Sequence, residues 1–152
     1  MSLFQRILVP VDFSGHAAQA LDTAIALAKR FDGSIDVLHS YPIAVGAMTP
    51  YGVPFPDTLE KDWRAAAQRT LDAWGEKVSA AGIPVRVHLT SLPASEAAVE
   101  LAEDEGIDLI VMGTRGLTGL KHVLLGSVAE RTLRHAPCAV LTVKADPDDA
   151  AA

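Results

Sequence analysis

The chain has 152 residues, a length that allows one α/β domain or two very small ones, and we expect one. Hydrophobic residues make up 49% and charged residues 21%, which is typical of a folded protein rather than a disordered one. The formal net charge of -6 disfavours the phosphate backbone of a nucleic acid as a partner. The single cysteine, Cys138, excludes an intramolecular disulfide framework and a multi-cysteine zinc site, and it fits a reducing compartment.

No segment is typical of export or of membrane insertion. The longest apolar runs fall well short of the roughly 18 residues that a spanning helix needs, and the first residues lead directly into a strand-like run. We therefore expect a cytoplasmic protein. Residues 146–152 hold only aspartate, proline and alanine, so we expect a domain over 1–145 followed by a flexible tail.

Hydrophobic periodicity predicts strands and helices that alternate along the chain, the pattern of an α/β fold with a parallel sheet. The predicted strands are 7–11, 35–40, 85–89, 109–112 and 139–143, and the predicted helices are 14–31, 58–81, 95–105 and 127–135. Strand 7–11 is apolar throughout and should be central, whereas 85–89 alternates and should be an edge. Strand 139–143 carries no charge, so if it is the other edge, a second copy of the chain could cover it.

The segments between these elements carry further signals. Ser14 should cap the first helix, and Asp32-Gly33 should end it. The 41–57 segment contains four prolines and is long for a loop, which indicates a flap over a functional site. In the helix that follows, Trp63 and Trp74 fall at core spacing, and we expect both in the core.

The predicted site lies where the first and fourth strands end, because open parallel sheets bind ligands at the carboxyl ends of adjacent central strands. Gly113 and Gly116 would let the backbone approach a ligand and adopt positive φ. Gly126-Ser127 opens a helix, whose free N–H groups and dipole attract phosphate. The loop also holds Arg115, Lys121 and His122, but charged loop residues usually face water, so these three stay outside the predicted core site.

Two familiar nucleotide motifs are missing. No Gly-Lys-Ser/Thr ends the glycine loop, which excludes a Walker A loop, and the turn after the first strand lacks Gly-x-Gly-x-x-Gly. The sequence instead matches Gly-x2-Gly-x9-Gly-Ser/Thr at Gly113, Gly116, Gly126 and Ser127, with Asp12 after the first strand. In these residues, and in its opening run 6–14 and closing run 136–143, the chain resembles the ATP-binding branch of the universal stress protein family.

The resemblance implies a Rossmann-like fold with five parallel strands in the order 3-2-1-4-5, and a homodimer through strand 139–143. It implies ATP as the ligand, with Mg2+ or Mn2+ bridging the phosphates. The histidines show no metal-ligand spacing, so we predict no metal ligand from the protein. By position, the resemblance implies that Val11, Asp12 and the backbone near Ser40 hold the adenosine and that Met112 and Gly113 lie against its ribose. Gly116, Gly126, Ser127 and Val128 would bind the phosphates, and Pro10 completes the predicted site. Two departures, Ser91 for a frequent glycine and Ala139 for a frequent proline, fall outside the phosphate loop.

We expect a dimeric ATP-binding module that acts in stress regulation, with no catalytic residue assigned. Slow ATP hydrolysis or autophosphorylation stays open as an alternative, and so does a dimeric interaction protein without nucleotide. Asp12 stays open as well, because an acid at this position is also common as an ordinary helix-start residue. A receiver domain would need an acid pair after the first strand and an aspartate after the third, where Thr90-Ser91 stands, and a flavodoxin would need a hydroxyl-rich first loop.

Overall fold

The computed structural model describes residues 3–41, 50–54, 56–115 and 125–145. Most of the predicted flap, Gly116 with the loop after it, and the predicted tail therefore lie outside the described residues. The elements in chain order are β1 (Arg6–Pro10), α1 (Gly15–Phe31), β2 (Ser34–Ser40), α2 (Asp57–Ala80), β3 (Val85–Thr90), α3 (Ala94–Asp104), β4 (Leu109–Gly113), α4 (Ser127–His135) and β5 (Ala139–Val143).

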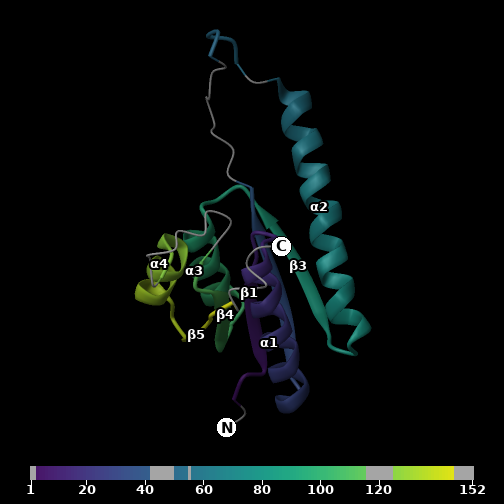
Figure 1. The fold of residues 1–152 in the computed structure, drawn as a ribbon, viewed down its shortest axis with the longest axis vertical. Coiled ribbons are helices and arrows are strands. Elements are labelled where there is room, and N and C mark those ends of the chain that lie inside the picture. Colours follow the sequence, from purple (N-terminus) through teal and green to yellow (C-terminus); the bar gives the residue numbers. More distant parts are fainter. Residues whose placement is uncertain (1–2, 42–49, 55, 116–124, 146–152) are drawn as a thin grey trace.

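The five strands form one parallel sheet in the order β3-β2-β1-β4-β5, which confirms the predicted fold class and strand order (Figure 1). Helices cover both faces of this sheet. Leu21 of α1 and Leu71 of α2 belong to the hydrophobic cluster on one face, and Ala98 of α3 and Ala129 of α4 belong to the cluster on the other. The central strand β1 is therefore sealed from both sides, as its unbroken apolar run predicts.

The first helix begins and ends as the sequence predicts. The Ser14 hydroxyl oxygen accepts a hydrogen bond from the Ala17 N–H at 3.2 Å and so caps α1. Asp32 ends the helix in the left-handed conformation, with φ of 56°. Gly33 serves a different purpose, because a Cβ there would lie 2.6 Å from the carbonyl oxygen of Phe4. Asp32 is thus the left-handed residue that ends α1, whereas Gly33 leaves space for the backbone of Phe4 and Gln5, which leads into β1.

The prediction that Trp63 lies in the core is wrong. Its side chain is 53% exposed, whereas Trp74, three turns further along α2, packs against the core. The reason is length: the N-terminal half of α2 extends beyond the ends of the strands, so no sheet lies beneath it (Figure 1). Residues at the same helical spacing are therefore packed against the core at the C-terminal end of α2, as Trp74 is, and exposed at its N-terminal end, as Trp63 is.

A network of charged side chains ties β2 to β3 and to the end of α3. The carboxylate of Asp36 is almost fully buried and accepts hydrogen bonds from His88 Nε2 at 2.7 Å and from Arg86 Nε at 2.9 Å. Arg86 also donates to Glu105 at 2.9 Å, and Glu105 accepts from Arg6 at 3.2 Å. Three cationic or hydrogen-bonding partners thus surround two carboxylates at the edge of the sheet.

None of the helices in the described ranges combines the length and the apolar character that crossing a membrane requires.

Candidate nucleotide-binding site

A cavity of about 500 Å3 opens at the carboxyl ends of β1 and β4. All the predicted site residues that the structure describes line it, which leaves only Gly116 outside the described residues. The predicted lining residues are Pro10, Val11, Asp12, Ser40, Met112, Gly113, Gly126, Ser127 and Val128. The volume is in the range of small-molecule and cofactor sites. The strand order explains the position, because connections from β1 and β4 leave toward opposite faces of the sheet and open a crevice between them.

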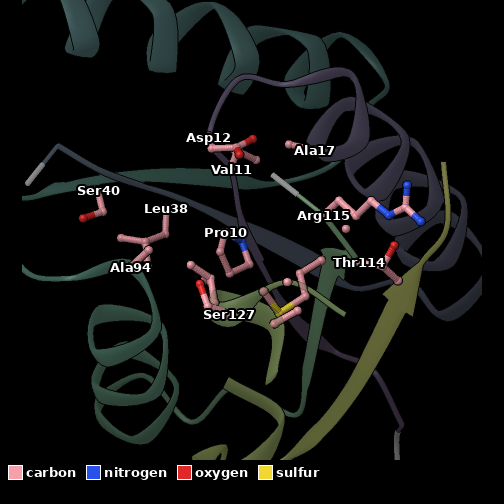
Figure 2. Close-up of a pocket in the computed structure, with 15 residues that line it drawn as sticks. Pro10, Val11, Asp12, Ala17, Leu38, Ser40, Ala94, Thr114, Arg115 and Ser127 are labelled. Carbon is pink, nitrogen blue, oxygen red and sulfur yellow. The ribbon is translucent and has the colours of Figure 1, made fainter. Parts of the chain in front are cut away.

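The cavity has two ends of different character. In Figure 2, Leu38, Ser40 and Ala94 lie at one end, whereas Thr114 and Arg115 lie at the other. The first end is mainly apolar, and the Ser40 hydroxyl there donates to the carbonyl oxygen of Leu92. The second end is built from the loop after β4. An elongated ligand with an apolar head and an anionic tail fits this division.

The part of the cavity wall formed by Val11 and Asp12 is held in place by contacts from outside the cavity. The Val11 N–H donates to the carbonyl oxygen of Leu38 at 2.8 Å. Phe13 has a positive φ of 64°, an uncommon conformation for a bulky residue, and its ring stacks on His39 with a centroid distance of 4.0 Å. Trp74 also contacts Phe13, with their ring centroids 5.5 Å apart. The strained turn is therefore fixed by aromatic packing while Val11 and Asp12 line the cavity.

Asp12 has a structural task as well as a place in the cavity wall. Its Oδ1 accepts hydrogen bonds from the Ser14 N–H at 3.1 Å and from the Ser14 hydroxyl at 2.5 Å. Ser14 in turn caps α1, so Asp12 fixes the residue that starts that helix. The helix-start interpretation of this acid is thus compatible with its position against the ligand space.

The two described glycines of the loop are needed for space rather than for backbone conformation. Gly113 does not adopt a positive φ, contrary to the prediction. A Cβ on Gly113 would lie 3.1 Å from the Cβ of His16 and 3.2 Å from the carbonyl oxygens of His16 and Arg115. A Cβ on Gly126 would lie 3.3 Å from the carbonyl oxygen of Thr114. Gly113 therefore lets β4 pass close to the start of α1.

The N-terminus of α4 faces the cavity without a side-chain cap. Gly126 occupies the N-cap position, where it offers no side-chain oxygen, and its own N–H donates to the Thr114 carbonyl oxygen at 2.6 Å. The next three residues, Ser127, Val128 and Ala129, line the cavity. The first N–H groups of a helix have no partner within the helix and carry a partial positive charge. The part of the cavity beside the start of α4 therefore suits an anionic group such as phosphate.

Sequence reasoning missed several lining residues. They are Ala17, Leu38, Ala94, Thr114, Arg115 and Ala129. Thr114 belongs to the glycine loop and could have been included by position alone. Arg115 is left outside the predicted core site because charged loop residues usually face water, but it lines the cavity. Leu38 and Ala94 carry no functional side chain and come from different parts of the chain, so only the folded arrangement brings them to the site.

Two other polar features bear on chemistry. Among the described residues, no group of three or more histidine, cysteine, aspartate or glutamate side chains is placed to hold a metal ion. Burial, together with the charge of Asp108, raises the pKa of the Cys138 thiol, which therefore stays protonated and weakly reactive at neutral pH.

The fold is that of an open-sheet α/β protein, and its cavity lies at the point where the strand order reverses, which is where proteins of this class usually bind ligands. The chain belongs to the universal stress protein family, whose model matches residues 3–144. It is 36% identical to the universal stress protein MJ0531 of Methanocaldococcus jannaschii, over 94% of this chain and 84% of that one.

Solved structures agree with this assignment. The structure of the hypothetical protein MJ0577 superposes with a TM-score of 0.80 at 29% identity, covering 95% of this chain and 98% of that one. A universal stress protein in complex with cAMP superposes with a TM-score of 0.71 at 24% identity, covering 94% of this chain and 98% of that one. At that identity the second structure shows the shared fold alone.

Proposed function

We propose that this protein binds ATP in the cavity between β1 and β4 and acts in the cytoplasm as a dimeric, nucleotide-dependent regulatory module in the response to stress. The observation that carries the proposal is the N-terminus of α4. It is left without a side-chain cap by Gly126 and presents Ser127 and Val128 to a cavity large enough for a nucleotide.

The different character of the two ends of the cavity supports one direction for the bound ATP. The base and ribose would occupy the end near Leu38 and Ser40, with Val11 and Asp12 above them. The phosphates would lie against Gly126, Ser127 and Val128. A divalent ion, Mg2+ or Mn2+, would neutralise the phosphates and would be held mainly by their oxygens.

We propose binding, rather than turnover, as the function. The carboxylate of Asp12 is engaged by both the N–H and the hydroxyl of Ser14, which suits a structural acid better than a general base. No catalytic residue is assigned. Hydrolysis would show as ADP that accumulates with protein concentration and is abolished by the variants described next.

The sharpest test of the phosphate end changes charge without changing the fold. Val128 lines the cavity, is 38% exposed and lies in the first turn of α4, where a glutamate is favoured by the helix dipole. Val128→Glu should therefore fold normally yet repel phosphates, and the affinity for Mg-ATP should fall at least about tenfold, which is about 1.4 kcal/mol. Calorimetric titration measures this change.

The matched control is Val128→Gln, which has the same shape without the charge and should lose much less affinity. Adenosine, which has no phosphate, should bind both variants almost equally. If the two variants lose ATP affinity to the same extent, or if the wild-type protein takes up no ATP, the proposed orientation or the proposed ligand is wrong.

The dimer would form through β5. This strand is an edge, since it pairs only with β4 among the described strands, and Leu141 on it is 38% exposed. Pairing of two uncharged edges across a two-fold axis would cover the strand that the sequence leaves unprotected.

A further inference from the structure

The hydroxyl of Ser40 is turned away from the cavity that this residue lines. Ser40 is the last residue of β2, and its hydroxyl donates to the carbonyl oxygen of Leu92, 52 positions further along the chain. In Figure 2 the Ser40 oxygen points away from Leu38 and Pro10. A hydroxyl has a single proton to donate. That proton is used within the protein, so the side chain does not offer it to a ligand.

The loop that receives this hydrogen bond leads directly into the cavity wall. Leu92 and Pro93 lie between β3 and α3, and Ala94, the first residue of α3, lines the cavity. Thr90 holds the same loop, because its Oγ1 accepts a hydrogen bond from the Leu92 N–H at 3.2 Å. The Tyr41 N–H donates to the carbonyl oxygen of Thr90 at 2.9 Å. The end of β2 is therefore tied to this loop by both side chain and backbone.

The start of α3 has no side-chain cap of its own. Its N-cap residue is Pro93, and no side-chain hydrogen bond is made at this position. In many helices the N-cap side chain helps to fix where the helix begins. The position of Ala94 therefore depends more strongly on the preceding loop, and so on the hydrogen bond from Ser40 to Leu92.

The same hydrogen bond joins the two walls of this end of the cavity. One wall is β2, which carries both Leu38 and Ser40 and pairs with β1 on one side and β3 on the other. The other wall is the start of α3 with the loop before it, where Leu92 is 38% exposed. An exposed loop opens more easily than a strand paired on both sides. The Ser40 hydroxyl thus holds the weaker wall against the stronger one.

We propose that Ser40 is a positioning residue for the nucleotide base: its hydroxyl holds Leu92 so that Ala94 stays at the distance from Leu38 that a flat base requires. This inference rests on the proposed function, which places the base at this end of the cavity. A slot held at its bound width before the ligand arrives lowers the cost of binding. The phosphate end is built from the start of α4 and does not include this loop, so the hydroxyl should affect binding of the base alone.

The test compares Ser40→Val with Ser40→Thr, because valine and threonine have the same shape and only threonine carries a hydroxyl. Ser40→Val should raise the dissociation constants of adenosine and of Mg-ATP by the same factor, about three- to tenfold, which is the range for one hydrogen bond. Ser40→Thr should bind both ligands like the wild type. Calorimetric titration measures these constants.

Inorganic tripolyphosphate, which has no base, tests whether the effect is confined to one end of the cavity. Its inhibition constant, measured by displacement of Mg-ATP, should be the same in the wild type and in both variants. A Ser40→Val protein that loses tripolyphosphate affinity as strongly as adenosine affinity would overturn the proposal, and so would a Ser40→Thr protein that binds adenosine as weakly as Ser40→Val.

The matched control is Ser34→Ala, at the opposite end of β2. The Ser34 hydroxyl also donates to a backbone carbonyl oxygen, that of Gln5, at 3.2 Å. Ser34→Ala should therefore lower stability to a similar extent in urea unfolding and leave adenosine affinity unchanged. If it weakens adenosine binding as much as Ser40→Val does, the effect comes from a general loss of stability and the proposal is wrong.

Hydrogen exchange without nucleotide separates a failure of this proposal from a failure of the proposed function. In Ser40→Val the Leu92 amide and the first turn of α3 should exchange about three- to tenfold faster than in the wild type. Unchanged exchange together with unchanged adenosine affinity would refute the role of Ser40 and leave ATP binding intact. A wild-type protein that binds neither ATP nor adenosine would refute both proposals, whatever the exchange shows.

Discussion

His39 anchors the backbone of Val11: its Nδ1–H donates to the Val11 carbonyl oxygen across 2.8 Å. The same ring stacks on Phe13, whose left-handed backbone would otherwise be unfavourable. The His39 side chain, at the end of β2, therefore holds the turn after β1 in position and stabilises its unfavourable backbone conformation at Phe13. Val11 and Asp12 of that turn line the cavity.

This arrangement predicts that His39→Phe weakens ATP binding. The phenyl ring keeps the stack on Phe13, but the Val11 carbonyl loses its donor, at a cost of about 1 kcal/mol. The dissociation constant should rise about three- to tenfold, as calorimetric titration would measure. Thermal unfolding is the control: the lost hydrogen bond should lower the melting temperature by only about 2–4 °C, so the variant stays folded during the titration. An unaltered affinity would mean that the hydrogen bond from His39 to Val11 does not affect ligand binding.

Gly113→Ala should destabilise the fold. The new methyl group would lie 3.1 Å from His16 Cβ and 3.2 Å from two carbonyl oxygens, so β4 and α1 must move apart, which costs about 1–3 kcal/mol. Gly126→Ala is the comparison. Its φ of -68° suits alanine and its nearest contact is 3.3 Å, so the loss should be smaller. Urea unfolding ranks the two variants, and the reverse order would contradict the structure.

The stability of the protein should depend on pH through Asp36. Burial raises the pKa of this carboxyl, but the hydrogen bonds from His88 and Arg86, together with their charges, outweigh burial and hold the pKa below its ordinary value. The folded state thus binds the proton less tightly than the unfolded chain. The contribution of Asp36 is complete above the ordinary carboxyl value, about 4, and is lost as the pH falls through it toward the lower folded value.

Asp36→Asn should accordingly be less stable than the wild type by about 2–3 kcal/mol at pH 7, because two charge-assisted hydrogen bonds are weakened. The difference in the free energy of unfolding between the wild type and Asp36→Asn should become smaller as the pH is lowered below about 4. Urea unfolding between neutral and acidic pH measures both. If the stability difference between the two proteins stayed constant down to the most acidic pH, the charge of the Asp36 carboxylate would contribute nothing to stability.

Leu141→Lys should separate the dimer proposed for β5 without unfolding the monomer. The residue is exposed on an edge strand, where lysine is a common device against pairing. Light scattering after size-exclusion chromatography should show the mass halved at low micromolar concentration. Leu133→Lys, at an exposed residue of α4 outside the edge strand, is the control and should leave the mass unchanged. Equal behaviour of the two variants would place the interface elsewhere.

Much of the fold could be predicted from the sequence because parallel strands buried on both faces leave a continuous apolar signal. The boundaries of α4 and β5 are as predicted, and the other elements shift by a residue or two. Trp63 shows where periodicity fails. A helix of 24 residues is about 36 Å long, whereas a strand of six residues is about 20 Å. Periodicity identifies the apolar face of α2, but it does not reveal where the sheet beneath that face ends.

The site was predictable on one wall and not on the other. The glycine loop and the start of α4 have recognisable chemistry, and Gly126 and Ser127 line the cavity. Leu38 and Ala94 form the opposite end with side chains that could belong to any core. Even at Gly113 the sequence suggested backbone freedom, whereas the structure shows close approach to His16.

The network of Arg6, Asp36, Arg86 and Glu105 joins segments that lie far apart along the chain, from β1 to the end of α3. The network can be complete only after those segments have assembled, so we predict that its interactions form after the main transition state of folding. Losing them should quicken unfolding and leave the refolding rate almost untouched. The network would then give the protein kinetic stability: it would slow the unfolding of the native state without accelerating folding.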